Sequence, residues 1–117
     1  MKAPFVAGAM LVALVALVAR PARAQTPDGQ ALYREHCRTC HGVAGKPTDF
    51  ARRAYKRIPT LSDSAFIVHR SQDSIVAILT RGAYDGKDMR SFKNLLSHDQ
   101  MVAVARYVRT LSAPKSP

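Results

Sequence analysis

The chain of 117 residues has only two cysteines, no internal repeat, and no stretch of convincing polar–apolar alternation. Alternation of that kind is the pattern of half-buried β-strands, so its absence favours an all-α fold. A second C-x-x-C pair and an H-x-x-x-H pair are also missing. The sequence therefore lacks the paired ligand motifs that are typical of a structural zinc site.

No apolar run reaches the roughly 20 residues needed to cross a bilayer. The longest begins after Lys2 and stops at Arg20, and an A-R-A stretch follows it. Residues 1–24 thus combine the basic start, apolar centre and small cleavage residues of an export signal. We expect cleavage before Gln25 and a periplasmic location, with a membrane tether only if the signal is retained.

Acidic residues are scarce in what remains after cleavage. Residues 25–113 are enough for one small domain, and residues 114–117 are expected to form a frayed tail. This mature chain has 15 basic and 8 acidic side chains, a formal net charge of +7, with a basic cluster R-R-A-Y-K-R at residues 52–57. Export argues against nucleic acid as the partner. The charge favours an acidic protein or an anionic membrane, or else a solvated loop without a dedicated partner.

Apolar periodicity and capping residues predict four helices. The first covers residues 28–40, and a weaker one covers residues 65–70, with Ser62 or Ser64 as its cap. The third begins at Ser71 or Asp73 and stops at Gly82. The last begins at Ser97, where Gln100 completes a capping box, and carries an apolar stripe formed by Met101, Val104, Val108 and Leu111.

Two long loops are predicted between these helices. One covers residues 42–60, with a single helical turn near residues 50–55, and the other covers residues 83–96. Loops of this length are usually functional.

The two cysteines belong to the stretch C-R-T-C-H at residues 37–41. A disulfide would close a very small loop and leave His41 without a role, and a thioredoxin-type pair belongs at the start of a helix after a strand. A zinc site would need one of the other three histidines. Covalent haem attachment explains all three residues, because both thiols can add to porphyrin vinyl groups while the imidazole reaches the iron. We favour this interpretation over the other three.

The sequence resembles the class I c-type cytochromes, which are single-haem, mostly helical electron carriers. The similarity covers most of the mature chain and includes C-R-T-C-H-G, G-x-x-x-Y at Gly29 and Tyr33, P-T-L at residues 59–61, and the stretch at residues 89–111. It implies an all-α domain of three to five helices packed around one covalently bound haem. It also implies that Gly29 lets the first helix cross the last one closely, against Tyr107.

The resemblance assigns roles to five residues. Cys37 and Cys40 would form the thioether links to haem, His41 would be the proximal iron ligand, and Met89 would be the distal one. The backbone carbonyl of Pro59 would accept a hydrogen bond from Nδ1 of His41, which fixes the ring and strengthens it as a donor.

The position of Met89 supports its role without reference to the family. Met101 lies on the apolar stripe of the last helix, where methionine usually fills the core, whereas Met89 lies in a polar loop. The family usually has proline directly after this methionine and this chain has Arg90, so we expect a weaker or more easily displaced iron–sulfur bond. The alternatives at the sixth position are His69, His98 or an open site; His36, His69 and His98 are otherwise interpreted as surface residues.

Two occupied axial positions would close the iron to substrates, which favours an electron carrier of a respiratory chain over an enzyme. The expected partner is an exported or membrane-bound redox protein with an acidic docking surface, and the carrier itself is expected to be a monomer. Two alternatives remain: a haem-based ligand sensor or peroxidase-like enzyme with a displaceable sixth ligand, and a fixed haem subunit of a larger respiratory complex.

Overall fold

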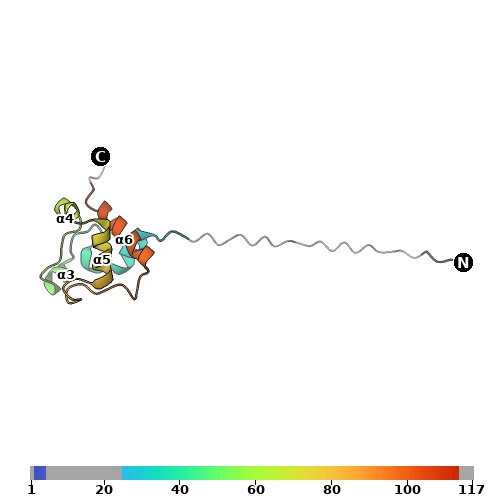
Figure 1. Cartoon of the computed structure of the whole chain (residues 1–117), viewed down its shortest axis with the longest axis horizontal. Coiled ribbons are helices and arrows are strands. Elements are labelled where there is room, and N and C mark those ends of the chain that lie inside the picture. The colour runs from blue at the N-terminus through green and yellow to red at the C-terminus, as the bar shows by residue number, and fades with distance from the viewer. Residues whose placement is uncertain (1, 5–24, 114–117) are drawn as a thin grey trace.

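The computed structural model describes residues 2–4 and 25–113. Most of the predicted export signal, and all of the tail at residues 114–117, lie outside the described residues. Within the described part the elements are α-helices, joined by loops and by one isolated β-bridge. The helices are α1 Gly29–His36, α2 Arg38–His41, α3 Asp49–Ala54, α4 Ser64–Val68, α5 Gln72–Arg81 and α6 His98–Thr110 (Figure 1).

The all-α class is confirmed, with six helices in the described ranges where the sequence suggests three to five. One reason is a break at Cys37, whose φ of −119° interrupts the predicted helix over residues 28–40 and separates α1 from α2. Another is α3, which forms the helical turn expected near residues 50–55 as a short helix of its own, one residue earlier. None of the helices in these ranges has the length and apolar character required to span a bilayer.

Helix starts follow the polar caps of the sequence. Asp28 caps α1 and Ser71 caps α5, while Ser97 and Gln100 form the predicted capping box at the start of α6. The predicted caps of α4 are wrong, since α4 begins with Ser64 and the carboxylate of Asp63 accepts from the Ala65 amide.

Helix α6 is the centre of the domain and contacts both α1 and α5. Its buried face follows the predicted apolar stripe and includes Met101, Ala103, Val104, Ala105 and Val108. Burial of Met101 confirms it as a core residue. The two ends of the domain are thereby joined, because α1 and α6 come from opposite ends of the described sequence.

The close crossing of α1 over α6 depends on Gly29, as predicted, and the atoms nearest to it belong to the backbone of Ala103 and Val104. A Cβ atom at Gly29 would lie 2.1 Å from the carbonyl oxygen of Ala103, so the contact is with the backbone of α6. Tyr107 packs against Tyr33, one turn further along α1, with ring centroids 5.2 Å apart. Helices packed backbone to backbone leave no room for a side chain, which is why the aromatic pair lies beside the crossing.

Candidate functional site

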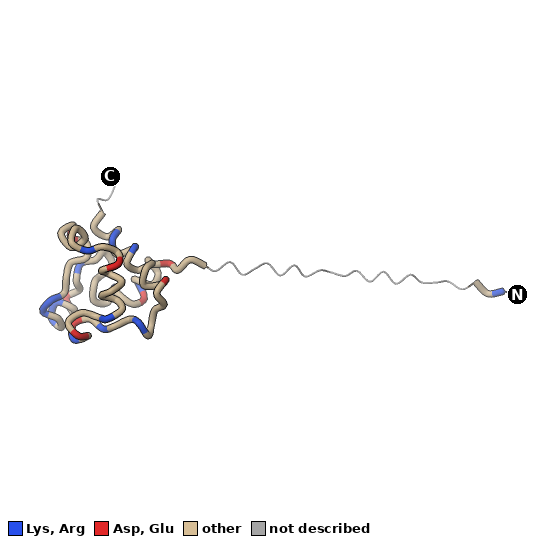
Figure 2. The backbone as a smooth tube through the Cα atoms, in the orientation of Figure 1, with Lys and Arg blue, Asp and Glu red and all other residues tan. Residues whose placement is uncertain are grey.

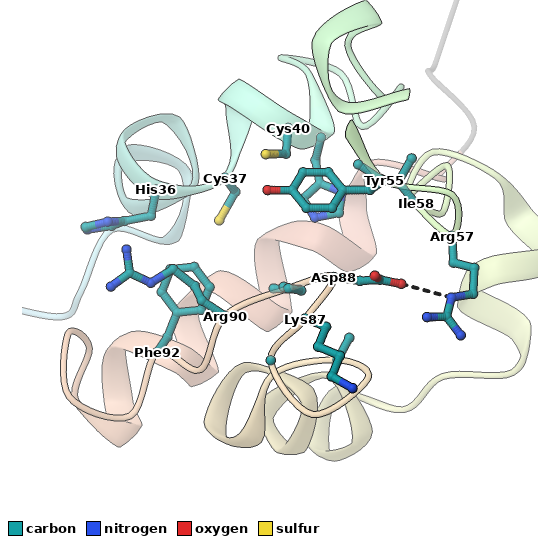
Figure 3. A pocket seen from close by; sticks show the side chains of 14 residues that line it. His36, Cys37, Cys40, Tyr55, Arg57, Ile58, Lys87, Asp88, Arg90 and Phe92 are labelled. Atoms are coloured by element: carbon teal, nitrogen blue, oxygen red, sulfur yellow. Dashed lines mark hydrogen bonds and ion pairs between the residues drawn. The ribbon is translucent and has the colours of Figure 1, made fainter. Parts of the chain in front are cut away.

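Two adjoining cavities, of about 230 and 190 Å³, lie between the C-R-T-C-H segment and the loop that carries Met89. They share five lining residues, namely Cys37, His41, Arg57, Ala83 and Met89. The sulfur atoms of Cys37 and Cys40 lie on the same side of the larger cavity (Figure 3). Four of the five predicted site residues, Cys37, Cys40, His41 and Met89, therefore line the larger cavity. The fifth, Pro59, lines the smaller one.

The two cavities differ in chemistry. The smaller one is mainly apolar and extends into the core, with Leu61, Phe66, Ile75, Ile78, Leu79, Val104 and Val108 among its walls. The larger one is edged by charged side chains, namely Arg57, Lys87, Asp88 and Arg90 (Figure 3). Together they suit a group with a broad apolar body and a polar edge.

The break at Cys37 places the thiols. Its amide still donates to the carbonyl of Tyr33 at 2.8 Å, so α1 ends there, and α2 then turns through Cys40 to His41. The two thiols do not form a disulfide. Burial, reinforced by the neighbouring Cys40 thiol, raises the pKa of Cys37 to about 11. Cys37 is thus a neutral, buried thiol, while Cys40 is half-buried.

Gly42 turns the chain away immediately after His41. It ends α2 with φ of +72°, and a Cβ atom there would lie 2.1 Å from the carbonyl oxygen of Lys46. The hydroxyl of Tyr33 donates to the Gly42 carbonyl at 2.7 Å and lies 3.4 Å from the His41 carbonyl oxygen. Tyr33 is fully buried, and that burial raises its pKa. The backbone around His41 is therefore held from the core side.

The His41 ring is held neutral, because burial lowers its pKa. Nδ1 is buried and has no hydrogen-bond partner, so the expected bond to the Pro59 carbonyl is not formed in the structure. Pro59 does lie with His41 in the wall of the smaller cavity.

Met89 is half-buried and is positioned by backbone contacts. The Ala83 amide donates to the Met89 carbonyl at 2.9 Å, and the Met89 amide lies 3.5 Å from the Ala83 carbonyl. Gly82, at φ of +82°, permits this approach, since a Cβ atom there would lie 2.5 Å from the Met89 carbonyl oxygen. This bridge between Ala83 and Met89 closes the loop at its base, an anchor that the polar composition of the loop does not predict.

The other histidines are distributed as follows. His69 and His98 are exposed, as predicted for surface residues. His36 differs, because it is half-buried, lines the larger cavity and lies edge-on to Phe92 with ring centroids 6.3 Å apart. No cluster of three or more metal-binding side chains occurs in the part of the chain that the structure describes, so the zinc interpretation gains no support.

Sequence reasoning placed Arg57 only in a basic cluster and did not consider Asp88. The structure pairs them at the mouth of the larger cavity, with Nε of Arg57 2.9 Å from Oδ2 of Asp88. They are 31 residues apart in the sequence. No local pattern could have indicated this pair.

Comparison with known proteins gives a consistent result. Residues 24–108 match the family model described as "Cytochrome C oxidase, cbb3-type, subunit III". The chain belongs to the class I c-type cytochromes. Among solved structures, "KustC0563 c-type cytochrome" is similar, with 31% identity and a TM-score of 0.65 over 74% of this chain and 99% of that one. A structure of a Kustc0563 point mutant gives 31% identity and a TM-score of 0.63 over 72% and 98% of the two chains. Among curated proteins, nothing matches.

The cofactor of this cytochrome is a covalently bound c-type haem. The site fits it, because the two thiols and the His41 imidazole line the larger cavity, which is edged by charged side chains and adjoins the apolar cavity that extends into the core. Its general role is haem-based electron transfer.

Proposed function

We propose that this cytochrome is a single-electron carrier in which His41 and Met89 are the two axial ligands of the haem iron. The observation that supports this is the shared lining of the two cavities, because both residues face the same space from opposite segments of the chain. When bound, the haem supplies reversible one-electron chemistry at its iron. The chain's part is to hold both ligands and to keep other molecules from the iron; a thioether ligand also favours the ferrous state.

The ligand pair is tested by absorption spectra of the haem-loaded protein, oxidised and reduced. The wild type should show the band of methionine bound to ferric iron and should not bind carbon monoxide. Met89→Ala should lose the band and bind carbon monoxide readily. Met101→Leu is the matched control, because Met101 is buried on α6 and fills the core, so this variant should keep the band.

Carbon monoxide binding by the wild type, without the methionine band, would contradict the carrier proposal. It would favour a ligand sensor or a peroxidase-like enzyme. In such a protein Arg90, which lines the larger cavity, would be the candidate polar group on the Met89 side of the haem.

The proposed partner is an exported or membrane-bound redox protein with an acidic docking surface, met by a monomeric carrier in the periplasm. Basic residues gather around α3 and the loop that follows it (Figure 2). Arg52, Arg53 and Lys56 are exposed there, and Arg57 extends this basic surface to the cavity mouth. A positive surface beside the cofactor favours fast, transient encounter with an acidic partner.

A second candidate is a fixed haem subunit of a larger respiratory complex. The description of the matching family, as an oxidase subunit, favours it. Mild detergent extraction of native membranes decides between them: a carrier should separate from the membrane at high salt, whereas a fixed subunit should co-migrate with the complex on a native gel.

A further inference from the structure

Arg57 joins the two loops that form opposite sides of the cavity mouth. It lies between α3 and α4, in the segment that leads to Pro59, whereas Asp88 directly precedes Met89. Their ion pair, at 2.9 Å, crosses the space between these segments (Figure 3). Arg57, which belongs to a different loop, therefore contacts the residue next to the proposed sixth ligand.

The same guanidinium makes a second contact with this loop. Its Cζ atom lies 3.5 Å from the centroid of the Tyr84 ring, which is a cation–π distance. Arg57 thus touches the Met89 loop near both of its ends, at Tyr84 and at Asp88.

The loop is in a conformation that requires support. Tyr84 and Asp85 have φ of +52° and +57°, in the left-handed region that is uncommon for residues other than glycine. For a bulky aromatic residue such backbone is strained, and it persists only where surrounding contacts hold it. The Ala83–Met89 bridge holds the base of the loop, and Arg57 holds its outer side.

We propose that Arg57 is a positioning residue that keeps Met89 over the iron, in the place of the proline that usually stiffens this loop after the methionine. This inference rests on the proposed ligation by Met89. In this chain Arg90 follows the methionine and is exposed. The rigidity that a proline ring would give the loop is therefore supplied by Arg57, from a distant segment of the chain.

An exposed ion pair usually contributes little, because water screens it and both side chains lose freedom. This pair differs in two respects. The Asp88 side chain is only 19% exposed, and the Arg57 guanidinium, with its side chain 54% exposed, is also seated on the Tyr84 ring. The planar guanidinium of Arg57 therefore contacts two residues of one loop, Tyr84 and Asp88, at the same time.

The test measures methionine ligation directly in haem-loaded protein. Arg57→Ala should raise the ratio of methionine-free to methionine-bound ferric protein by about 5- to 30-fold, the range expected for loss of such a contact. The methionine band should weaken, and the carbon monoxide affinity of the ferrous form should rise in proportion to the open fraction. Asp88→Asn, which keeps the shape of the side chain, should give a smaller change in the same direction.

Three comparisons separate positioning from general destabilisation. Arg109→Ala, on exposed α6 surface, removes the same charge, and Asp49→Asn alters the partner of Arg52 in an ion pair that lines neither cavity; both should keep the wild-type band. The double variant Arg57→Ala with Asp88→Ala should show no greater loss than Arg57→Ala alone, because Arg57→Ala already removes the ion pair through which Asp88 acts.

The outcomes are distinct. A wild type that shows the methionine band, with Arg57→Ala and Asp88→Asn variants that retain it fully, overturns the positioning role and leaves the carrier proposal intact. A wild type without the band contradicts the carrier proposal itself. If Arg57→Ala does not fold, as judged by its urea transition, Asp88→Asn decides.

Discussion

Tyr33 connects the core of the domain to the proximal side of the site. Its ring packs against Tyr107 and its hydroxyl donates to the Gly42 carbonyl, just after the proposed iron ligand His41. The side chain is fully buried, so its hydroxyl has no access to water. Without this hydroxyl the Gly42 carbonyl would lose its hydrogen-bond donor.

We expect Tyr33→Phe to lower the free energy of unfolding of the haem-loaded protein by about 1–2 kcal/mol, because the Gly42 carbonyl would lose its donor. Urea unfolding followed by circular dichroism measures the change. Tyr107→Phe is the matched control, since Tyr107 is only half-buried and its ring contact is kept. Equal losses in both variants would contradict the role of the hydrogen bond.

At the scale of residues, the sequence indicates chemistry only where the chemistry is local. Cys37, Cys40 and His41 are contiguous in a motif, so their grouping could be predicted and the structure places them around one cavity. The contact of Arg57 with Asp88 spans 31 residues and leaves no local pattern. The hydrogen bond expected from His41 to the Pro59 carbonyl is not formed in the structure, although both residues line the same cavity.

The crossing of α1 and α6 is the main contact between elements. A side chain at Gly29 would collide with the Ala103 carbonyl oxygen at 2.1 Å, and that atom belongs to a helix backbone that cannot turn aside. The two helices would have to separate.

We therefore expect Gly29→Ala to destabilise the haem-loaded protein by about 1–3 kcal/mol, the usual scale for overpacking a tight contact. This loss would occur despite the better intrinsic helix propensity of alanine. Thermal unfolding measures it, with Gln30→Ala as the control on the exposed side of the same turn. A more stable Gly29→Ala protein would show that the helices separate at little cost.

At the scale of elements, helix ends are predictable where a cap lies beside them. The box of Ser97 and Gln100 is a pair of contacts three residues apart, and it starts α6 as predicted. The break at Cys37 has no such marker, because neither glycine nor proline stands there. The break accompanies the placing of both thiols in the wall of the larger cavity, a tertiary arrangement that no local pattern marks.

Charge is a property of the whole molecule. The mature chain carries a formal charge of +7, and its basic residues gather around α3 and the loop that leads to the cavity mouth (Figure 2). Electrostatic steering can raise association rates by about 10- to 1,000-fold, and salt screens it.

We expect the second-order rate of electron transfer with an acidic redox protein to fall steeply as ionic strength rises. Lys56→Glu should reduce the low-salt rate more than Arg109→Glu, although both change the net charge equally, because only Lys56 lies beside the proposed docking region. Stopped-flow kinetics over a salt series measures both effects. A rate that is independent of salt, or equal losses in the two variants, would contradict docking at this surface.

The division of the site between the two ends of the chain has a consequence for the order of assembly. In an exported chain, as we propose here, residues 37–41, which would bind haem covalently, would leave the translocation channel before the loop that carries Met89 and before α6, which completes the core through Gly29. The attachment motif is contiguous and would be complete first, whereas the proposed ligation by both His41 and Met89 would need segments that follow later in the chain. Biogenesis would pass through a haem-bearing chain whose sixth position closes last, when α6 reaches α1.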